Sequence, residues 1–358
     1  MTAQDKATPT GTGATRTGVT STGVTRTDVN STGVTRIGVT MGDPSGIGPE
    51  IIVAALAEMS PDVRSKSVVI GNIDLLRRAD QLRNTGLTFI NGVDASNGDV
   101  PVVHVATKGQ EQIADGKESV AGGEAAYRFV VKAVELSLAG DISVIVTAPL
   151  NKAAMHSAGH HFDGHTELLA HLTGAKSSFM LLAGDKLNAI HVTTHMSLRN
   201  AAEKPGVERV LATIRAGDKH FRELGIEQPR IAVAGLNPHC GEGGIFGTEE
   251  AERITPAVEA AKNEGINVQG PISGDTVFYR ALKGEFDLVV AQYHDQGHIP
   301  TKLIAFDETV NVSLGLPIRR TSVDHGTAFD IAWKGVADNT NMKSAIAYAR
   351  RMADGHGA

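Results

Sequence analysis

The sequence has almost no cysteine and no long apolar run. Cys240 is the single cysteine among 358 residues, so an intramolecular disulfide cannot form. Such sparse cysteine usage fits a reducing compartment. No run approaches the ~18 apolar residues that a membrane span needs, and the first residues lack the basic-then-apolar pattern of a signal peptide. We therefore expect a cytoplasmic protein that does not enter a membrane.

The chain also lacks an excess of positive charge. Its formal net charge is -6, which argues against a general nucleic-acid binder but leaves room for a local basic pocket. Hydrophobic residues make up 41% and charged residues 21%, as in an ordinary globular protein. The length of 358 residues is enough for two domains or one large one.

The first 35 residues contain a short repeat instead of a core pattern. Thr-Gly-Val-Thr begins at positions 17, 22 and 32, with a degenerate copy at 27–30. A five-residue period fits neither a strand nor a helix, and the units are too short and too few for a solenoid. We predict that residues 1–35 form a disordered, low-complexity leader.

From Arg36 onward, apolar runs typical of strands alternate with helical patterns. This alternation predicts a mostly parallel sheet that helices cover on both faces. The turn at 42–50, which links the first strand to the first helix, could present backbone N–H groups to a ligand. Its glycine spacing matches neither the dinucleotide fingerprint nor a P-loop, so a tight turn without a ligand is equally compatible.

Three histidines follow buried-looking strands. His195, His239 and His294 each come just after such a run, and they are separated by 44 and 55 residues. These spacings are too wide for a local metal finger, so only the fold could assemble the three side chains. Neutral imidazole suits Zn, Ni, Co or Fe better than Mg. A hydrogen-bonded structural role remains the alternative for each histidine taken singly.

A second polar group stands where a helix is predicted to begin. His165, Thr166 and Glu167 combine an imidazole, a hydroxyl and a helix N-terminus, which could form a phosphate pocket. The alternative is that Thr166 is a simple helix cap.

Charged residues elsewhere could serve substrate binding or proton transfer. Lys302 and Arg320 could neutralise a phosphate or carboxylate, and Asn311 offers a neutral donor and acceptor. Asp275 and Lys152 are candidates for proton transfer. Solvated surface charge is the alternative for the two basic residues.

Taken together, these motifs resemble those of the 4-hydroxythreonine-4-phosphate dehydrogenase family. The resemblance covers the chain from about Arg36 to the C-terminus. It is carried, in order, by Gly42–Glu50 (GDPSGIGPE), Gly164–Glu167 (GHTE), Thr193–His195 (TTH), Leu236–Glu242 (LNPHCGE), Tyr293–Gly297 (YHDQG) and Arg320–Ala328 (RTSVDHGTA).

The resemblance implies an NAD-dependent enzyme that oxidises a secondary alcohol, after which the β-keto acid loses CO2. It assigns one divalent metal ion (Zn, Co, Ni, Mn or Mg) to His195, His239 and His294. The implied substrate-binding residues are His165, Thr166, Lys302, Asn311 and Arg320. The implied catalytic residues are Asp275 and Lys302.

The resemblance also implies an α/β fold like that of isopropylmalate and isocitrate dehydrogenases. Two α/β/α domains, residues 36–155 plus 305–358 and residues 156–304, would flank a cleft. The second domain would carry the interface of a homodimer, whose site is built from both subunits. A loop similar to the NAD adenosine-binding loop contains Asp324, His325, Gly326 and Thr327.

Two segments narrow the expected substrate. Residues 296–303 and 328–333 look closer to the branch that converts D-threonate or D-erythronate 4-phosphate to dihydroxyacetone phosphate and CO2. The alternative is the 4-hydroxy-L-threonine-4-phosphate dehydrogenase of vitamin B6 synthesis. A branch acting on aromatic cis-dihydrodiols fits less well, because a phosphate pocket at His165 and Thr166 would be useless to it. A metal-dependent hydrolase or aldolase, or a non-catalytic sugar-phosphate binder, also remains open.

Overall fold

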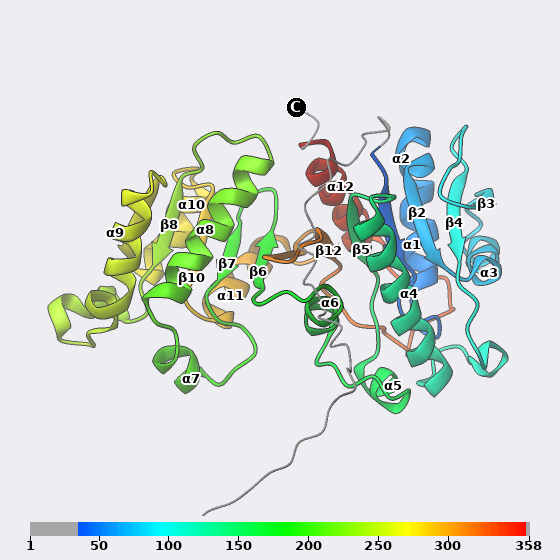
Figure 1. Cartoon of the computed structure of the whole chain (residues 1–358), viewed down its shortest axis with the longest axis horizontal. Coiled ribbons are helices and arrows are strands. Elements are labelled where there is room, and N and C mark those ends of the chain that lie inside the picture. Colours follow the sequence, from blue (N-terminus) through cyan, green and yellow to red (C-terminus); the bar gives the residue numbers. More distant parts are fainter. Residues whose placement is uncertain (1–34, 356–358) are drawn as a thin grey trace, which may run out of the picture. The chain divides into compact units, whose positions relative to one another are not determined.

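Twelve strands form one sheet in the computed structural model, which describes residues 35–355 (Figure 1). The predicted leader, apart from Thr35, therefore lies outside the described residues. In order across the sheet, the strands are β3 (Phe89–Asn91), β4 (Val100–His104), β2 (Ser67–Gly71), β1 (Ile37–Thr40), β5 (Val144–Thr147), β12 (Arg320–Ser322), β11 (Val310–Leu314), β6 (Phe179–Ala183), β7 (Ala189–His191), β10 (Leu288–Ala291), β8 (Ile231–Ala234) and β9 (Val268–Ile272).

The direction of the strands reverses in the middle of the sheet. The first six strands of that order are parallel to one another, and we call them the first parallel group. The last four, β7, β10, β8 and β9, form the second parallel group. Between them, β12, β11, β6 and β7 pair antiparallel in turn, so the two groups run in opposite directions. The predicted mostly parallel sheet is confirmed, but the antiparallel centre was not predicted.

Helices connect the strands and cover the sheet. The helices are α1 (Gly48–Ala57), α2 (Pro61–Ser65), α3 (Ile73–Arg83), α4 (Val120–Ala139), α5 (Lys152–Ser157), α6 (His165–Thr173), α7 (Leu198–Glu203), α8 (Val207–Glu223), α9 (Thr255–Asn263), α10 (Gly274–Leu282), α11 (His294–Ala305) and α12 (Thr340–Asp354). Three short segments of other helix types are η1 (Gln110–Gln112), η2 (Pro238–Gly244) and η3 (Glu250–Ile254). No helix of residues 35–355 is long and apolar enough to cross a membrane.

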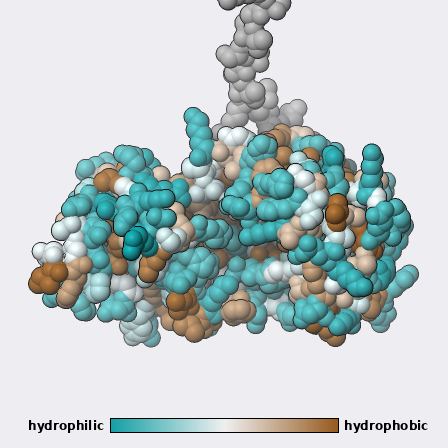
Figure 2. All heavy atoms as spheres, turned by 90° about the horizontal axis from the view of Figure 1, so that it is seen from below, coloured by the Kyte–Doolittle hydropathy of each residue, from teal (hydrophilic) through white to brown (hydrophobic). Residues whose placement is uncertain are grey.

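The C-terminal elements return to the N-terminal half of the sheet. β12 pairs with β5, and α12 packs against both strands (Figure 1). This arrangement is compatible with the predicted first domain, although one sheet continues through both predicted domains and their boundaries stay a prediction. On the face drawn in Figure 2, hydrophobic residues reach the surface in small groups among hydrophilic ones.

Helix α1 is buried because almost every residue in it is apolar. Pro49 stands in its first turn, where a missing N–H costs no hydrogen bond. The exception to the apolar pattern is Glu50, which is fully buried. Its carboxylate accepts the backbone N–H of Trp333 and, at 2.7 Å, that of Gly335. These bonds tie the first helix to a loop that lies 283 to 285 residues later in the chain.

Helix α4 packs its apolar face on the first parallel group. Ser119 caps its start by accepting the N–H of Gly122 at 3.0 Å, and Gly140 ends it in the left-handed conformation. Phe129, in the middle of the helix, is 1% exposed, whereas Leu138 near its end is 59% exposed.

We predict that Phe129→Ala lowers the free energy of unfolding by about 3–5 kcal/mol, because it removes a ring from a filled core. Leu138→Ala is the matched control on the same helix and should change that free energy by less than ~0.5 kcal/mol. Urea unfolding followed by circular dichroism measures both values. Equal effects of the two variants would contradict the assigned packing of α4.

Candidate active site

A cavity of about 490 Å³ lies over the central strands of the sheet, and we call it the central cavity. Residues from β6, β11 and β12 contribute to its lining, and so do α5, α6, α11 and residues that follow β5, β7 and β12. The predicted site residues that line it are His165, Thr166, His195, His294, Lys302, Asn311, Arg320, Asp324, His325 and Gly326. The structure therefore brings together most of the residues that the sequence had singled out.

A buried guanidinium forms part of the cavity wall. Arg320 is 3% exposed; its Nε and Nη2 donate to Thr147 Oγ1 (3.1 and 2.8 Å) and its Nη1 donates to Ser313 Oγ (2.9 Å). Burial lowers the pKa of Arg320 to about 10, against a smaller opposing effect of Glu167, so the group stays charged at neutral pH. Among the described residues, no carboxylate forms an ion pair with it. An anion bound in the cavity would supply the missing countercharge.

The N-terminus of α6 provides a second feature suited to an anion. The helix begins at His165, as predicted, and its N-cap Gly164 has no side chain that could cap the first N–H groups. The Nε2 atom of His165 is buried and has no hydrogen-bond partner among the described residues. Burial, together with the nearby Arg320 and Lys152, holds the pKa of His165 well below its usual range. A neutral imidazole and free N–H groups therefore lie beside a buried cation.

Lys302 stands on α11 and reaches the opposite part of the lining. Its Nζ forms an ion pair with Asp324 Oδ2 at 2.8 Å, and Asp324 belongs to the loop after β12. Asn311 of β11 lines the same cavity, and its Oδ1 is buried without a hydrogen-bond partner in the described part of the chain. Lys302 and Asn311, two of the predicted substrate-binding residues, thus have polar atoms that a ligand could bind.

Two of the three predicted metal ligands are neighbours. The ring centroids of His195 and His294 are 6.2 Å apart. Nδ1 of His294 contacts Asp295 Oδ1 at 2.7 Å, which leaves Nε2 as the ring atom for a ligand. His298 stacks on His294 with centroids 3.6 Å apart. Burial, followed by the effect of His294, lowers the pKa of His298 to about 4, so that ring is uncharged at neutral pH.

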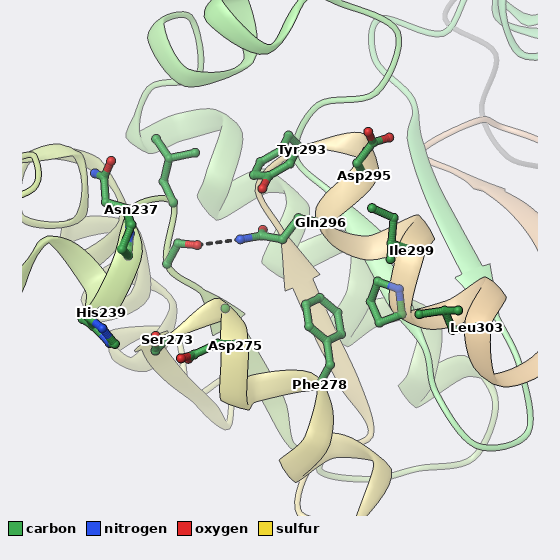
Figure 3. Close-up of a pocket in the computed structure, with 15 residues that line it drawn as sticks. Asn237, His239, Ser273, Asp275, Phe278, Tyr293, Asp295, Gln296, Ile299 and Leu303 are labelled. Carbon is green, nitrogen blue, oxygen red and sulfur yellow. Dashed lines mark hydrogen bonds between the residues drawn. The ribbon is translucent and has the colours of Figure 1, made fainter.

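The third predicted metal ligand lies elsewhere. His239 and Asp275 line a second cavity of about 670 Å³, which we call the outer cavity. Figure 3 shows both on one side of it, with Tyr293, Ile299 and Leu303 across from them. Within residues 35–355, no group of three His, Cys, Asp or Glu side chains is placed to hold a metal ion. His239 thus lines a different cavity from His195 and His294.

The predicted cofactor loop is anchored to the first strand-helix turn. The N–H of Ile47 donates to the carbonyl oxygen of Thr327 at 3.0 Å. Trp333 Nε1 donates to the carbonyl oxygen of Pro44 at 2.9 Å, in addition to the bonds that Glu50 makes. His325 and Gly326 line the central cavity, whereas Thr327 faces the turn at Gly46. The turn at 42–50 and the loop after β12, which are far apart in the sequence, are thus held together by hydrogen bonds.

Comparison with known proteins agrees with this arrangement. Residues 63–349 match the family described as pyridoxal phosphate biosynthetic protein PdxA. The chain belongs to the PdxA family. It is 47% identical over 321 residues to D-threonate 4-phosphate dehydrogenase from Salmonella typhimurium. The aligned region covers 88% of this chain and 98% of the relative.

Two further relatives of this PdxA-family chain carry the other family name. It is 46% identical over 326 residues to 4-hydroxythreonine-4-phosphate dehydrogenase from Trichlorobacter lovleyi, covering 88% of this chain and 96% of that one. A crystal structure of 4-hydroxythreonine-4-phosphate dehydrogenase from Klebsiella pneumoniae superposes with a TM-score of 0.81 at 44% identity, covering 89% and 99% of the two chains. The relatives are dehydrogenases, so the predictions of family, α/β fold and oxidoreductase class are confirmed.

The sequence had not assigned a role to several residues of the PdxA-family site. His298 and Ser322 line the central cavity, and Glu50 and Glu250 hold loops beside the two cavities. The signal for His298 was its position four residues after His294, which places both side chains on one face of α11. Ser322 follows Arg320 by two residues, so both side chains point to the same face of the sheet. The two glutamates gave no local signal, because their partners are distant in the sequence or on loop backbone.

We predict that Arg320→Met weakens binding of inorganic phosphate to this PdxA-family chain roughly tenfold to hundredfold, because charge-assisted hydrogen bonds contribute about 1.5–3 kcal/mol. Isothermal titration calorimetry measures the affinity. Arg77→Met is the control, since Arg77 is exposed on α3 and pairs only with Asp74 among the described residues. Unchanged phosphate affinity in Arg320→Met would show that the buried guanidinium is not the anion site.

Proposed function

We propose that the chain oxidises and decarboxylates a 4-phosphorylated hydroxy acid with NAD and a divalent metal ion. The preferred substrates are D-threonate 4-phosphate and D-erythronate 4-phosphate, and the products are dihydroxyacetone phosphate and CO2. The relatives named for the first of these substrates align over nearly their whole length. The observation that carries the proposal is the buried Arg320, which forms no ion pair within residues 35–355. It lies beside the uncapped start of α6, in the same cavity as His195 and His294.

The phosphate occupies the part of the cavity formed by Arg320, His165 and Thr166. Arg320 supplies the charge, and the free N–H groups of α6 supply donors that need no reorganisation. Asn311 and Lys302 bind the rest of the substrate from β11 and α11. Because these elements are fixed in the fold, they hold the reacting carbon in one orientation for hydride transfer.

The reaction begins at the C3 hydroxyl of the substrate. Oxidation removes the C3 hydrogen with its electron pair, which an oxidised nicotinamide would accept as a hydride when bound, and a base of the site takes the hydroxyl proton. The resulting β-keto acid then breaks its C1–C2 bond; CO2 departs, and the electron pair remains as an enolate that takes a proton at C2. Lys302 and Asp275 are the residues that we assign to these proton transfers.

The residues around the predicted metal position fit a divalent ion. His195 and His294 are neighbouring imidazoles, and the bond of His294 to Asp295 orients the ring with Nε2 available. When bound, such an ion polarises the reacting hydroxyl and stabilises the negative charge left by CO2 loss. Because His239 opens into the outer cavity, we propose that it serves the central cavity of a second copy, together with Asp275.

A homodimer would bring the two cavities of different copies together. Helix α11 borders both cavities, presenting His294, His298 and Lys302 to one and Ile299 and Leu303 to the other. Leu303 is 82% exposed and Phe306 67% exposed, so this helix ends in an uncovered apolar face. In a twofold dimer the same patch meets itself, which would bury that face and complete two equivalent sites.

We assign NAD binding to the loop at Asp324–Thr327. Its His325 and Gly326 border the central cavity, and a Cβ at Gly326 would meet open space, so the backbone there is accessible. The anchoring of Thr327 to Ile47 and of Trp333 to Pro44 keeps the loop in place before a ligand binds. NAD binding through this loop needs no dinucleotide fingerprint.

The second candidate function is oxidation of 4-hydroxy-L-threonine 4-phosphate in pyridoxal phosphate synthesis. Two relatives that are 46% identical to this chain are named 4-hydroxythreonine-4-phosphate dehydrogenase. The two substrate types differ at the carbon beside the carboxylate, where one has a hydroxyl and the other an amino group. The preference for the hydroxy acid rests on the likeness of residues 296–303 and 328–333 to the hydroxy-acid branch. The relatives named for D-threonate 4-phosphate support the same preference.

We predict NADH formation with D-erythronate or D-threonate 4-phosphate and much less with 4-hydroxy-L-threonine 4-phosphate. A chelator should abolish the reaction, and added divalent metal should restore it, because the metal is the electrophile of the site. Absorbance of reduced nicotinamide measures turnover. Exclusive turnover of the amino acid would favour the second candidate, and no NADH with any substrate and metal would exclude the dehydrogenase mechanism.

We also predict that inactive His195→Ala and His239→Ala chains restore activity when they are unfolded together and refolded as mixed dimers. A mixed dimer has one intact site, so random mixing yields roughly a quarter of the wild-type activity. Mixtures of His195→Ala with His294→Ala should stay inactive, because both residues come from the same copy. If the first mixture also stays inactive although mixed dimers form, His239 does not act across the interface.

A further inference from the structure

The segment that carries His239 adopts an unusual backbone conformation. Five consecutive residues, 239–243, have positive φ angles between 43° and 77°. Three of them, His239, Cys240 and Glu242, are not glycine. Each non-glycine residue in this region costs of order 1–2 kcal/mol, so the surrounding structure must hold the turn in place.

His239 itself does little to fix this turn. Its side chain is exposed, and the structure gives it no hydrogen bond or ion pair with a described residue. Its position in the outer cavity therefore depends on the backbone that precedes and follows it. A metal ligand held this way is only as well placed as its supporting residues.

Glu250 provides the support immediately before the turn. This carboxylate is 4% exposed and has no ion pair among the described residues. Its Oε1 accepts the backbone N–H groups of Leu236 at 2.8 Å and Asn237 at 2.6 Å. Its Oε2 accepts from Asn237 Nδ2 at 2.9 Å, and the same Nδ2 donates to Glu249 Oε2 at 2.7 Å. The residue two places before His239 is thus held by both its backbone and its side chain.

Three glycines make room for this network. A Cβ at Gly241 would lie 3.0 Å from Glu250 Oε2, and one at Gly247 would lie 2.6 Å from Asn237 Nδ2. A Cβ at Gly235 would lie 2.7 Å from Cys240 Sγ. The turn therefore closes tightly around the carboxylate, and Cys240 N–H completes it by donating to the carbonyl oxygen of Asn237 at 3.1 Å.

We infer that Glu250 is a positioning residue for the metal site of the opposite subunit, acting through Asn237 and the left-handed turn to place His239. This inference rests on the proposed function, in which His239 completes a site whose other ligands are His195 and His294. Glu250 touches neither metal nor substrate. Its loss lets the strained turn relax, so the metal loses a correctly placed third ligand while the two ligands of the other copy remain.

The first test measures metal affinity of the full-length protein without substrate. Glu250→Ala should lower the affinity for Zn²⁺ or Co²⁺ about 10–100-fold, the usual effect of losing an outer partner of a ligand. The visible absorption of bound Co²⁺ should also weaken and shift as the coordination changes. Glu250→Gln keeps an acceptor for the two backbone N–H groups and should fall between Glu250→Ala and the wild type.

Two variants separate the possible failures. Glu252→Ala is the matched control, because Glu252 is exposed on the same segment and bonds only to Thr248 in the described structure; it should bind metal normally. His239→Ala reports on the proposed function itself. If His239→Ala leaves metal affinity unchanged, the proposed metal site is wrong. If His239→Ala weakens binding but folded Glu250→Ala does not, only the role of Glu250 is overturned.

Mixed dimers give the decisive readout. Glu250→Ala should restore activity when paired with His195→Ala, because the mixed dimer keeps one site with every residue intact. It should not do so when paired with His239→Ala, since both changes affect the same contribution. A general loss of stability in Glu250→Ala would not distinguish pairing with His195→Ala from pairing with His239→Ala. Restoration with His239→Ala, or none with His195→Ala although mixed dimers form, would overturn the inference.

Discussion

The reversal of strand direction at the centre of the sheet determines where chemistry can occur. The two parallel groups run in opposite directions, so their carboxyl ends do not share one edge. The central cavity instead lies over β11 and β12 and receives residues that follow strands of both groups. Arg320 shows the consequence. Its hydrogen bonds join β12 to β5 and β11, yet no carboxylate in the described part of the chain forms an ion pair with it. Burying such a cation costs several kcal/mol, which an anionic ligand would offset on binding.

Helix α11 gives the two cavities a common wall. Its helical period places His294, His298 and Lys302 four residues apart on one face, whereas Ile299 and Leu303 lie on another. A single rigid element thus carries part of the central site and an exposed apolar surface. Burial of that surface against a second copy would bring the outer cavity of one chain to the central cavity of the other. Dimerisation and completion of the metal site would then be one event.

The local features of this site could be predicted from the sequence, and its long-range features could not. The start of α6 at His165 and the strands before His195 and His294 follow from apolar runs and helix-start signals within ten residues. The antiparallel centre could not be deduced, because short buried strands have the same apolar pattern in either direction. The separation of His239 from the other histidines was equally hidden. His239 stands in a left-handed turn next to the backbone that Glu250 binds, and the glycines around it indicate only a loop.

Glu50 and Glu250 stabilise loop backbone in the same way at two places in the structure. Each is a buried carboxylate without a cationic partner in the described structure, and each accepts backbone N–H groups from a segment beside residues with positive φ. The hydrogen bonds that each carboxylate accepts fix a backbone that would otherwise relax. A loop fixed in this way pays little ordering entropy when a ligand arrives. Because the two loops carry the proposed cofactor-binding residues and His239, both proposed ligand sites would be ordered before binding by carboxylates that do not touch the ligands.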